Sequence, residues 1–365
     1  MLDCCIIGAG ASGLFCGMLL PREWKKCILE KNSSAGVKIL LSGKWRCNFT
    51  NINVSDKTYV WDQTERLKSY FFQFWPKDMI KFLEDHWIQS QQEDFWRMLL
   101  KSNKARELLD FLLEENKKNL TEIEYNHAVI SIQKQLDYYL IKTNQATFES
   151  KRVIIATGGQ SFPKVWGSDF ISIFWKEQDI AIHTPAPALC WLETKEDLSS
   201  LSWSSVSAEI KLTLGDKTVY QEEHTVLFTH WGVSGPGIFN ASLWLGYLDP
   251  ELKKKAKIRL LITKDQITKR LLAYLRAPKG LRNYTMTLTP IALRNWDEAK
   301  VMSWGLLMEE VNENFELKKL PWVYLLWEAL NITGKTGWYN LQWCWTSAFC
   351  CAKAMRKQYY FSWEK

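Results

Sequence analysis

The hydrophobic and polar positions of the first thirty residues predict a strand, a turn, a helix and a second strand. Leu2 to Ile7 is an apolar run with one early charge, which is typical of a buried parallel strand. Leu14 to Leu20 is apolar with helical propensity, and Lys26 to Leu29 predicts a strand that ends at Glu30. These elements follow one another too closely for anything but a single compact unit.

Further along, the spacing of apolar residues changes. Residues 62–118 carry them three and four positions apart, which predicts a mainly helical segment. Residues 121–150 predict short strands, among them Val129 to Gln133 and Tyr138 to Thr143. Arg152 to Ala156 predicts a buried strand that runs into a second glycine turn, Thr157-Gly158-Gly159.

Apolar and polar residues alternate from about Pro185 to Pro321, which predicts a β-rich region with a short helical section in 264–284. A final helix is predicted at Leu341 to Lys357, after a return through Tyr324 to Leu330. The strands predicted inside the β-rich region are Ser207 to Leu214, Thr218 to Gln221, Thr225 to Thr229 and Ile258 to Ile262.

A glycine-rich turn joins the first predicted strand to the first helix. Its sequence, Gly8-Ala9-Gly10-Ala11-Ser12-Gly13, has the G-x-G-x-x-G spacing of dinucleotide-binding loops. There the glycines permit a tight turn, close backbone approach to a pyrophosphate and close packing of helix on strand. Glu30 is placed to accept hydrogen bonds from an adenosine ribose. A purely structural turn is the alternative, but strand, helix and acid all come in the expected order.

Composition and charge narrow the class of protein. The 365 residues predict one to three domains, and 47% apolar with 24% charged residues is ordinary for a globular protein. The net charge is +7, but the cations are scattered, and Lys253 to Lys255 is interpreted as a solvated turn. No apolar stretch reaches membrane-spanning length, and Asp3 does not suit a signal peptide.

The nine cysteines include no C-x-x-C pair and have no metal-ligand spacing with the five histidines. We therefore expect a reduced, cytoplasmic protein without a bound metal. The segment from Lys31 to Asn51 is rich in small residues and cations, and it is interpreted as a loop that wraps back over a cofactor. A plain surface loop is the alternative.

Together, several motifs resemble a family of bacterial NAD(P)/FAD-dependent, aminoacetone-oxidase-like oxidoreductases that has a bile-acid dehydro-reductase among its relatives. The resemblance covers nearly the whole chain. Besides the N-terminal loop, it is carried by Leu41-Ser42-Gly43-Lys44-Trp45-Arg46-Cys47-Asn48-Phe49-Thr50-Asn51, Ala156-Thr157-Gly158-Gly159-Gln160-Ser161-Phe162-Pro163, Leu227-Phe228-Thr229-His230 with Ser234-Gly235-Pro236, and Thr336-Gly337-Trp338-Tyr339-Asn340-Leu341-Gln342-Trp343.

The resemblance implies an α/β fold in which a discontinuous, Rossmann-like FAD domain of the two-dinucleotide-binding type carries an inserted β-rich domain. It implies FAD-domain segments at 1–184 and 322–365, with the β-rich domain at 185–321. It also implies the cofactor-binding residues, grouped by the part of FAD they would approach. These are Gly8, Gly10, Ala11, Ser12 and Gly13 for the pyrophosphate, Glu30 for the ribose, Val129 for the adenine, Arg46, Cys47 and Asn48 for the phosphates or isoalloxazine, Glu328 for the ribityl region, and Tyr339, Asn340 and Gln342 over the flavin, with Lys31, Lys38, Ser42, Gly43, Thr157, Gly158, Gly159 and Gly337 beside them.

Where the chain departs from the family pattern, it repeatedly has tryptophan in place of glycine. The chain has 20 Trp against 18 Gly. The positions are Trp45, Trp87, Trp96, Trp304, Trp322, Trp327 and Trp338, with Trp24, Trp175 and Trp203 as weaker fits, whereas Trp343 is tryptophan in the family too. A bulky residue forced into a glycine conformation costs about 1–3 kcal/mol.

Our hypothesis is that UGA codons read as glycine in the source organism have been translated as tryptophan. A genuine tryptophan-rich paralogue with a damaged site is the alternative.

The predicted function is hydride transfer through flavin N5 to or from a small organic substrate, with NAD(P)H as electron donor and O2 turnover as an alternative. No general acid is assigned. Cys47 and His230 are considered, but a buried thiol beside FAD and a histidine that caps a strand explain them as well. Two other functions stay open: a flavoprotein acting on RNA, although no nucleic-acid partner is expected, and a non-catalytic remnant. The substrate and the oligomeric state are not predicted.

Overall fold

The computed structural model describes residues 1–60, 64–163, 167–180, 182 and 184–363, and it divides into two compact units. The first unit is Met1–Gln160, Lys164–His183 and Gly305–Lys365, and the second is Ser161–Pro163 and Thr184–Trp304. The chain thus leaves the first unit and returns to it, but it returns at Gly305 rather than at residue 322. Residues 305–321 belong to the first unit because they pair with it, for example where Leu317 N–H donates to Val323 O (2.8 Å).

A five-stranded parallel sheet forms the centre of the first unit. Four of its strands are buried along their whole length, so their side chains do not alternate between buried and exposed. The fifth, β7 (Thr121–Tyr125), lies at the edge of the sheet and alternates between buried or half-buried and exposed residues. In register, Ile6 lies opposite Ile28 on one side and Ile154 on the other. The strand order is β21-β11-β1-β2-β7, with bounds β21 Val323–Leu325, β11 Val153–Ile155, β1 Cys4–Ile7, β2 Lys26–Glu30 and β7 Thr121–Tyr125.

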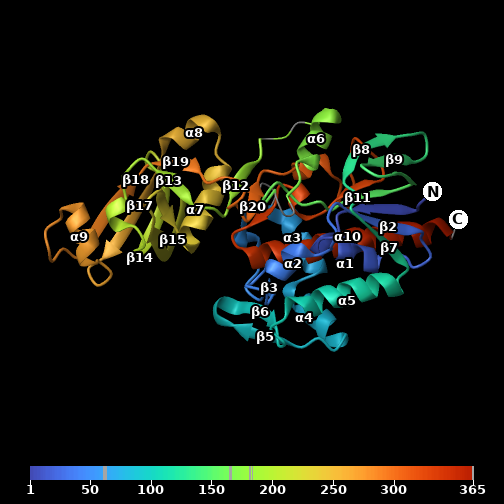
Figure 1. Ribbon diagram of the computed structural model, residues 1–365, viewed down its shortest axis with the longest axis horizontal. Coiled ribbons are helices and arrows are strands. Elements are labelled where there is room, and N and C mark those ends of the chain that lie inside the picture. The colour runs from blue at the N-terminus through green and yellow to red at the C-terminus, as the bar shows by residue number, and fades with distance from the viewer. Residues whose placement is uncertain (61–63, 164–166, 181, 183, 364–365) are drawn as a thin grey trace. The chain divides into compact units, whose positions relative to one another are not determined.

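Helices and a small sheet cover the two faces of this parallel sheet. Figure 1 shows α1 (Ala11–Leu19), α5 (Ala105–Lys118) and α10 (Gly337–Trp363) on one side. On the other side lies an antiparallel sheet of β8 (Val129–Lys134), β9 (Tyr139–Thr143) and β10 (Thr147–Ser150). This is the layered arrangement of a Rossmann-type domain, as the glycine loop predicts.

The segment predicted as helical, 62–118, is only partly so; its residues 62 and 63 lie outside the described part of the chain. The segment does contain three helices, but between Asp85 and Ala105 it forms two strands, Ser90–Glu93 and Arg97–Leu100, which pair with each other and with the strand Asn48–Asn51. The elements of this part of the first unit are α2 Val37–Leu41, β3 Asn48–Asn51, β4 Tyr59–Val60, α3 Thr64–Gln73, α4 Pro76–Asp85, β5 Ser90–Glu93, β6 Arg97–Leu100, α6 Phe170–Glu177 and β22 Thr333–Gly334.

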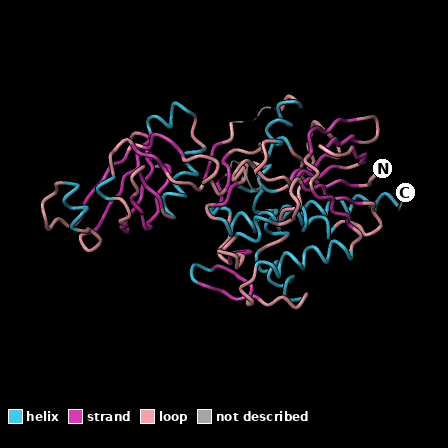
Figure 2. Tube along the Cα trace, viewed as in Figure 1, coloured by secondary structure: helices cyan, strands magenta, loops and turns pink. Residues whose placement is uncertain are grey.

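The second unit is built on a seven-stranded sheet, and Figure 2 shows that strands dominate it. Its order is β18-β17-β14-β15-β16-β13-β19, with antiparallel neighbours throughout. Its strands are β13 Leu192–Thr194, β14 Ser205–Leu214, β15 Lys217–Phe228, β16 Gly232–Ser234, β17 Ala256–Thr263, β18 Asn283–Leu288 and β19 Pro290–Leu293, and a separate pair joins β12 Ala186–Ala188 to β20 Val301–Ser303.

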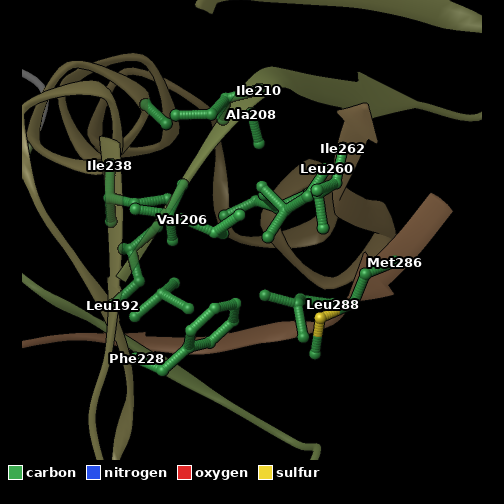
Figure 3. Packing of buried hydrophobic residues seen from close by; sticks show 14 of the residues in the cluster. Leu192, Val206, Ala208, Ile210, Phe228, Ile238, Leu260, Ile262, Met286 and Leu288 are labelled. Atoms are coloured by element: carbon green, nitrogen blue, oxygen red, sulfur yellow. The ribbon is translucent and has the colours of Figure 1, made fainter. Parts of the chain in front are cut away.

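One face of this sheet packs on α7 (Pro236–Gly246) around a closed apolar core, in which Val206, Phe228 and Ile238 converge (Figure 3). Three predictions are corrected here. The two strands expected around 218–229 are one strand, β15. The helical section in 264–284 shrinks to α9 (Lys269–Leu275), and the lysine turn is a short helix, α8 (Pro250–Lys255), capped by Asp249. None of the described helices combines the length and apolar character needed to cross a membrane.

Candidate cofactor-binding site

A cavity opens at the carboxyl ends of the parallel strands in the first unit. Ile7 at the end of β1, Glu30 at the end of β2 and Ala156 just after β11 all line it. This edge is where doubly wound sheets bind ligands. Of the predicted site residues, nine line this cavity, namely Gly8, Gly10, Ala11, Ser12, Glu30, Lys31, Lys38, Val129 and Thr157.

The glycine loop has the geometry that its spacing predicts. Gly8 has a φ of +105°, and a Cβ atom there would lie 2.6 Å from Ala156 O. A Cβ atom on Gly13 would lie 2.0 Å from Gly8 O, because the start of α1 packs tightly on the loop. A Cβ atom on Gly10 would meet nothing within 4 Å, since this residue borders the cavity. Two glycines therefore serve packing, and Gly10 leaves room for a ligand.

The Ser12 hydroxyl shows what kind of ligand suits this loop. The side chain is buried in the second position of α1, and its Oγ atom has no hydrogen-bond partner in the described structure. The first N–H groups of a helix also lack partners within the helix and carry the positive end of its dipole. Together, the Ser12 hydroxyl and these N–H groups form a binding site suited to an anionic group such as a pyrophosphate. This end of the cavity fits a dinucleotide.

Glu30 fixes the loop from the end of β2. Its Oε2 accepts a hydrogen bond from the Ala9 N–H, and its Oε1 accepts two from the backbone and side chain of Asn32, all at 2.9 Å. A carboxylate has about four acceptor positions, so capacity remains for a ribose hydroxyl. Next to it, Lys31 donates to Gly167 O, and burial lowers the pKa of its ammonium group.

The opposite end of the cavity is occupied by an indole. Trp327 lines the cavity, and its ring covers Gly158, where a Cβ atom would lie 2.6 Å from Cζ3. The Lys38 Nζ atom lies 4.3 Å from the centre of the same ring and 3.3 Å from Glu328 Oε2. Glu328 also accepts from the Gly159 N–H at 2.9 Å. Gly158, Gly159 and Glu328 therefore lie close to Trp327 or to one another, but none of the three lines the cavity.

The segment around Arg46 lies away from this cavity. Arg46 forms an ion pair with Glu93 at 2.6 Å, and Asn48 begins β3, with its side-chain oxygen buried and unpartnered. Burial raises the pKa of the Cys47 thiol to about 12, so the group stays neutral. Ser42 donates to Ile39 O at the end of α2, and Gly43 follows with a φ of +58°.

The residues that the resemblance places over a flavin make hydrogen bonds at the start of α10. Gln342 is fully buried and hydrogen-bonds Thr50 (2.5 Å) and Thr346 (3.0 Å). Asn340 donates to Gly334 O at 2.9 Å, and the Tyr339 backbone oxygen accepts from the Tyr59 hydroxyl at 2.7 Å. Gly337 is the first residue of α10, with open space where a Cβ atom would be.

Comparison with known proteins identifies the family. The model of the HI0933-like protein Rossmann domain family matches residues 2–354. The chain belongs to this family. The resemblance drawn from the motifs is thereby confirmed, as is the Rossmann-type α/β fold.

Two relatives and one solved structure resemble the chain along nearly its whole length. It is 26% identical over 391 residues to a ribosomal RNA dihydrouridine synthase of Escherichia coli, covering 96% of this chain and 97% of the other. It is 23% identical over 401 residues to a 3-dehydro-bile acid delta(4,6)-reductase of Clostridium scindens, covering 96% and 98%. The fold is similar to that of 3-ketosteroid delta1-dehydrogenase from Sterolibacterium denitrificans, with a TM-score of 0.53, 10% identity and coverage of 98% and 99%.

Sequence reasoning missed several cavity residues of this HI0933-like chain. Gly36 has a φ of +67°, and its N–H donates to Ala9 O at 2.9 Å. A glycine in a polar loop could have pointed to this residue from the sequence. His127 donates its N–H to Glu30 O at 2.8 Å just after β7, where another parallel strand ends. Leu341 and Cys344 come from α10, and only the packing of that helix brings them to the cavity. His230 lies in the second unit, where its ring is tilted by 40° against the ring of Trp231, with 4.2 Å between the ring centres.

Proposed function

We propose that this protein is an FAD-dependent oxidoreductase that reduces a carbon–carbon double bond. The observation that carries the cofactor assignment is the buried, unpartnered Ser12 hydroxyl at the N-terminus of α1, in a cavity at the ends of parallel strands. The reaction is supported by the names of two kinds of relative, since a dihydrouridine synthase and a delta(4,6)-reductase are both named for the reduction of such a bond.

The chain's own residues bind and orient the cofactor. Ser12 and the first N–H groups of α1 would hold the pyrophosphate, and Glu30 would hold the adenosine ribose. Val129 at the start of β8 would contact the adenine. When bound, FAD supplies the hydride acceptor and donor, with NAD(P)H as the external reductant. Nine free, buried cysteines suit a reducing compartment such as the cytoplasm.

The substrate we propose is a uridine of ribosomal RNA. The support is that two relatives with that name, from Escherichia coli and Haemophilus influenzae, are each 26% identical over nearly the full length. The net charge of +7 favours contact with a polyanion. A small unsaturated ketone is the second candidate, and it is favoured by the bile-acid relative and by the scattered rather than clustered cations.

A paired reduction assay separates the two substrates. Two versions of the protein are expressed, one with the given sequence and one with glycine at the tryptophan positions where the family has glycine. Each is supplied with FAD and either NADH or NADPH. It is offered an unmodified ribosomal RNA transcript or a steroid with a double bond conjugated to a ketone. We expect uridine in the RNA to gain the mass of two hydrogen atoms.

The matched control is Ser12→Asp, which places a carboxylate where the pyrophosphate would sit but keeps a residue that suits a helix N-terminus. It should abolish reduction and leave the folded state intact. Reduction of the steroid alone would overturn the RNA assignment and keep the reductase. Reduction of neither substrate by protein with bound FAD would overturn the reductase itself.

A further inference from the structure

Among the residues that the structure describes, seven tryptophans have a backbone conformation that glycine adopts most readily. All seven lie in the left-handed region, with φ between +53° and +71°. A residue with a Cβ atom is disfavoured there, and bulky residues more than most, whereas glycine enters it freely. The seven are Trp45 (φ +71°), Trp87 (+64°), Trp96 (+58°), Trp203 (+65°), Trp304 (+66°), Trp322 (+66°) and Trp327 (+53°).

The end of α4 shows the mismatch most clearly. The Ile88 N–H donates to Leu83 O and the Trp87 N–H donates to Glu84 O, both at 2.9 Å. These two bonds form a Schellman motif, and Trp87 occupies its left-handed position, which is the position where glycine predominates. The Trp87 side chain is 93% exposed, so packing does not explain its presence.

Three other tryptophans provide a contrast. Trp175, Trp343 and Trp345 lie in helices, are at most 1% exposed and have ordinary backbone angles. They pack against other aromatic rings, and Trp345 also donates its indole N–H to Phe49 O at 2.8 Å. By contrast, Trp45 and Trp203 are 62% and 73% exposed. Three tryptophans thus pack in the core with ordinary backbone angles, whereas Trp45 and Trp203 are largely exposed in a left-handed conformation.

We propose that the seven left-handed positions are glycine in the protein as its own cells make it. One reassigned codon, UGA read as glycine there and written as tryptophan here, explains why tryptophan stands at seven of the eighteen non-glycine positions with a positive φ among the described residues. The backbone criterion also sharpens the set drawn from the motifs. Of the three weaker fits it keeps Trp203 and leaves out the buried Trp24 and Trp175, and it does not extend to Trp338, which is in α10.

The change matters most at residue 327. Without the indole, the space above Gly158 joins the cavity, and the Gly159 N–H and Glu328 then border it. A glycine at 327 would thus be a cofactor-positioning residue, because it would let a ligand lie along this second glycine turn. This part of the inference rests on the proposed FAD function.

Two observations test the reassignment independently of any cofactor. The gene should carry UGA codons at the seven positions and UGG codons at Trp343 and Trp345. Peptide mass spectrometry of the protein purified from the cells that carry the gene should find glycine at 45, 87 and 327. UGG codons or tryptophan-containing peptides at these positions would overturn the proposal.

A recombinant comparison tests the structural argument. Changing all seven positions to glycine should raise the thermal unfolding midpoint by about 10 °C or more, because seven disfavoured conformations are relieved. Trp343→Gly is the matched control and should lower the midpoint, since it empties a core position. A seven-glycine variant no more stable than the printed sequence would overturn the argument. If that variant is stabilised and its peptides match but it does not bind FAD, the proposed function fails and this inference stands.

Discussion

The indole ring of Trp327 rests on the backbone of Gly158, so closely that a Cβ atom at 158 would lie 2.6 Å from Cζ3. Both residues have left-handed backbones, with φ of +53° and +71°. Gly158 belongs to the turn after β11 and Trp327 to the turn after β21, two neighbouring strands of the parallel sheet. The pair therefore closes one end of the cavity at the edge where a doubly wound sheet binds its ligand.

Opening that end should strengthen cofactor binding. Trp327→Gly removes the ring from the cavity and should lower the Kd for FAD at least about tenfold, a change of about 1.4 kcal/mol. Trp322→Gly is the matched control, because it relieves the same backbone conformation at a residue that does not line the cavity. Titration of flavin fluorescence measures both variants. Equal affinities would mean that the Trp327 ring does not obstruct the cofactor.

Two alanine substitutions should separate packing from ligand approach in the first glycine turn. Gly13→Ala places a Cβ atom 2.0 Å from Gly8 O and should destabilise the fold by about 2 kcal/mol or more. Gly10→Ala meets no atom within 4 Å, so it should leave the unfolding midpoint unchanged and weaken FAD binding. Urea unfolding and FAD titration report the two effects. The account is wrong if Gly10→Ala binds FAD as well as the parent.

The first unit could be predicted from sequence where a residue's role is local. The glycine spacing, the buried strands and Glu30 at the end of β2 all follow from short-range chemistry, and the structure has them at the predicted places. Residues whose role depends on distant packing could not be placed. Gln342 is an example, because its partner Thr50 lies 292 positions away in the chain.

The hairpin of β5 and β6 was missed for a related reason. It pairs with β3, and its Glu93 binds Arg46, so the partners that select a strand over a helix are remote in sequence. The same contact takes Arg46 away from the cavity. The tryptophan positions were visible in the motifs, but only the backbone angles separate Trp203 from Trp175.

The Cys47 thiol should be inert in the folded protein. It is fully buried, and burial raises its pKa to about 12, so the reactive thiolate is scarce at neutral pH. Iodoacetamide at pH 8 should leave Cys47 unmodified until the protein is unfolded, as read by peptide mass spectrometry. Modification of Cys47 in the native protein, as fast as in a urea-unfolded control, would contradict this burial.

The Lys26 ammonium should make stability depend on alkaline pH. Its Nζ atom donates to Pro21 O (2.6 Å) and Asn119 O (2.8 Å), and burial lowers its pKa from 10.5 to about 8. Between these values the unfolded chain binds more protons than the folded one, so the free energy of unfolding rises with pH.

The gain from Lys26 should reach about 2–3 kcal/mol between pH 8 and 10.5. Urea unfolding of the parent and of Lys26→Met across this pH range measures the gain. It is the change with pH in the difference between their free energies of unfolding. Lys25→Met, at an exposed neighbour, is the control and should keep a constant difference from the parent. A constant difference for Lys26→Met as well would contradict the desolvated lysine.

Flavin binding tests the central claim most directly. The protein with glycine at the seven left-handed positions should be purified, equilibrated with FAD, freed of excess cofactor and scanned in the visible range. The account predicts the absorbance of about one flavin per chain, which bleaches on addition of NADH or NADPH without air. A folded protein that stays colourless at FAD concentrations of about 100 μM, or roughly −5.5 kcal/mol of binding free energy, would contradict it.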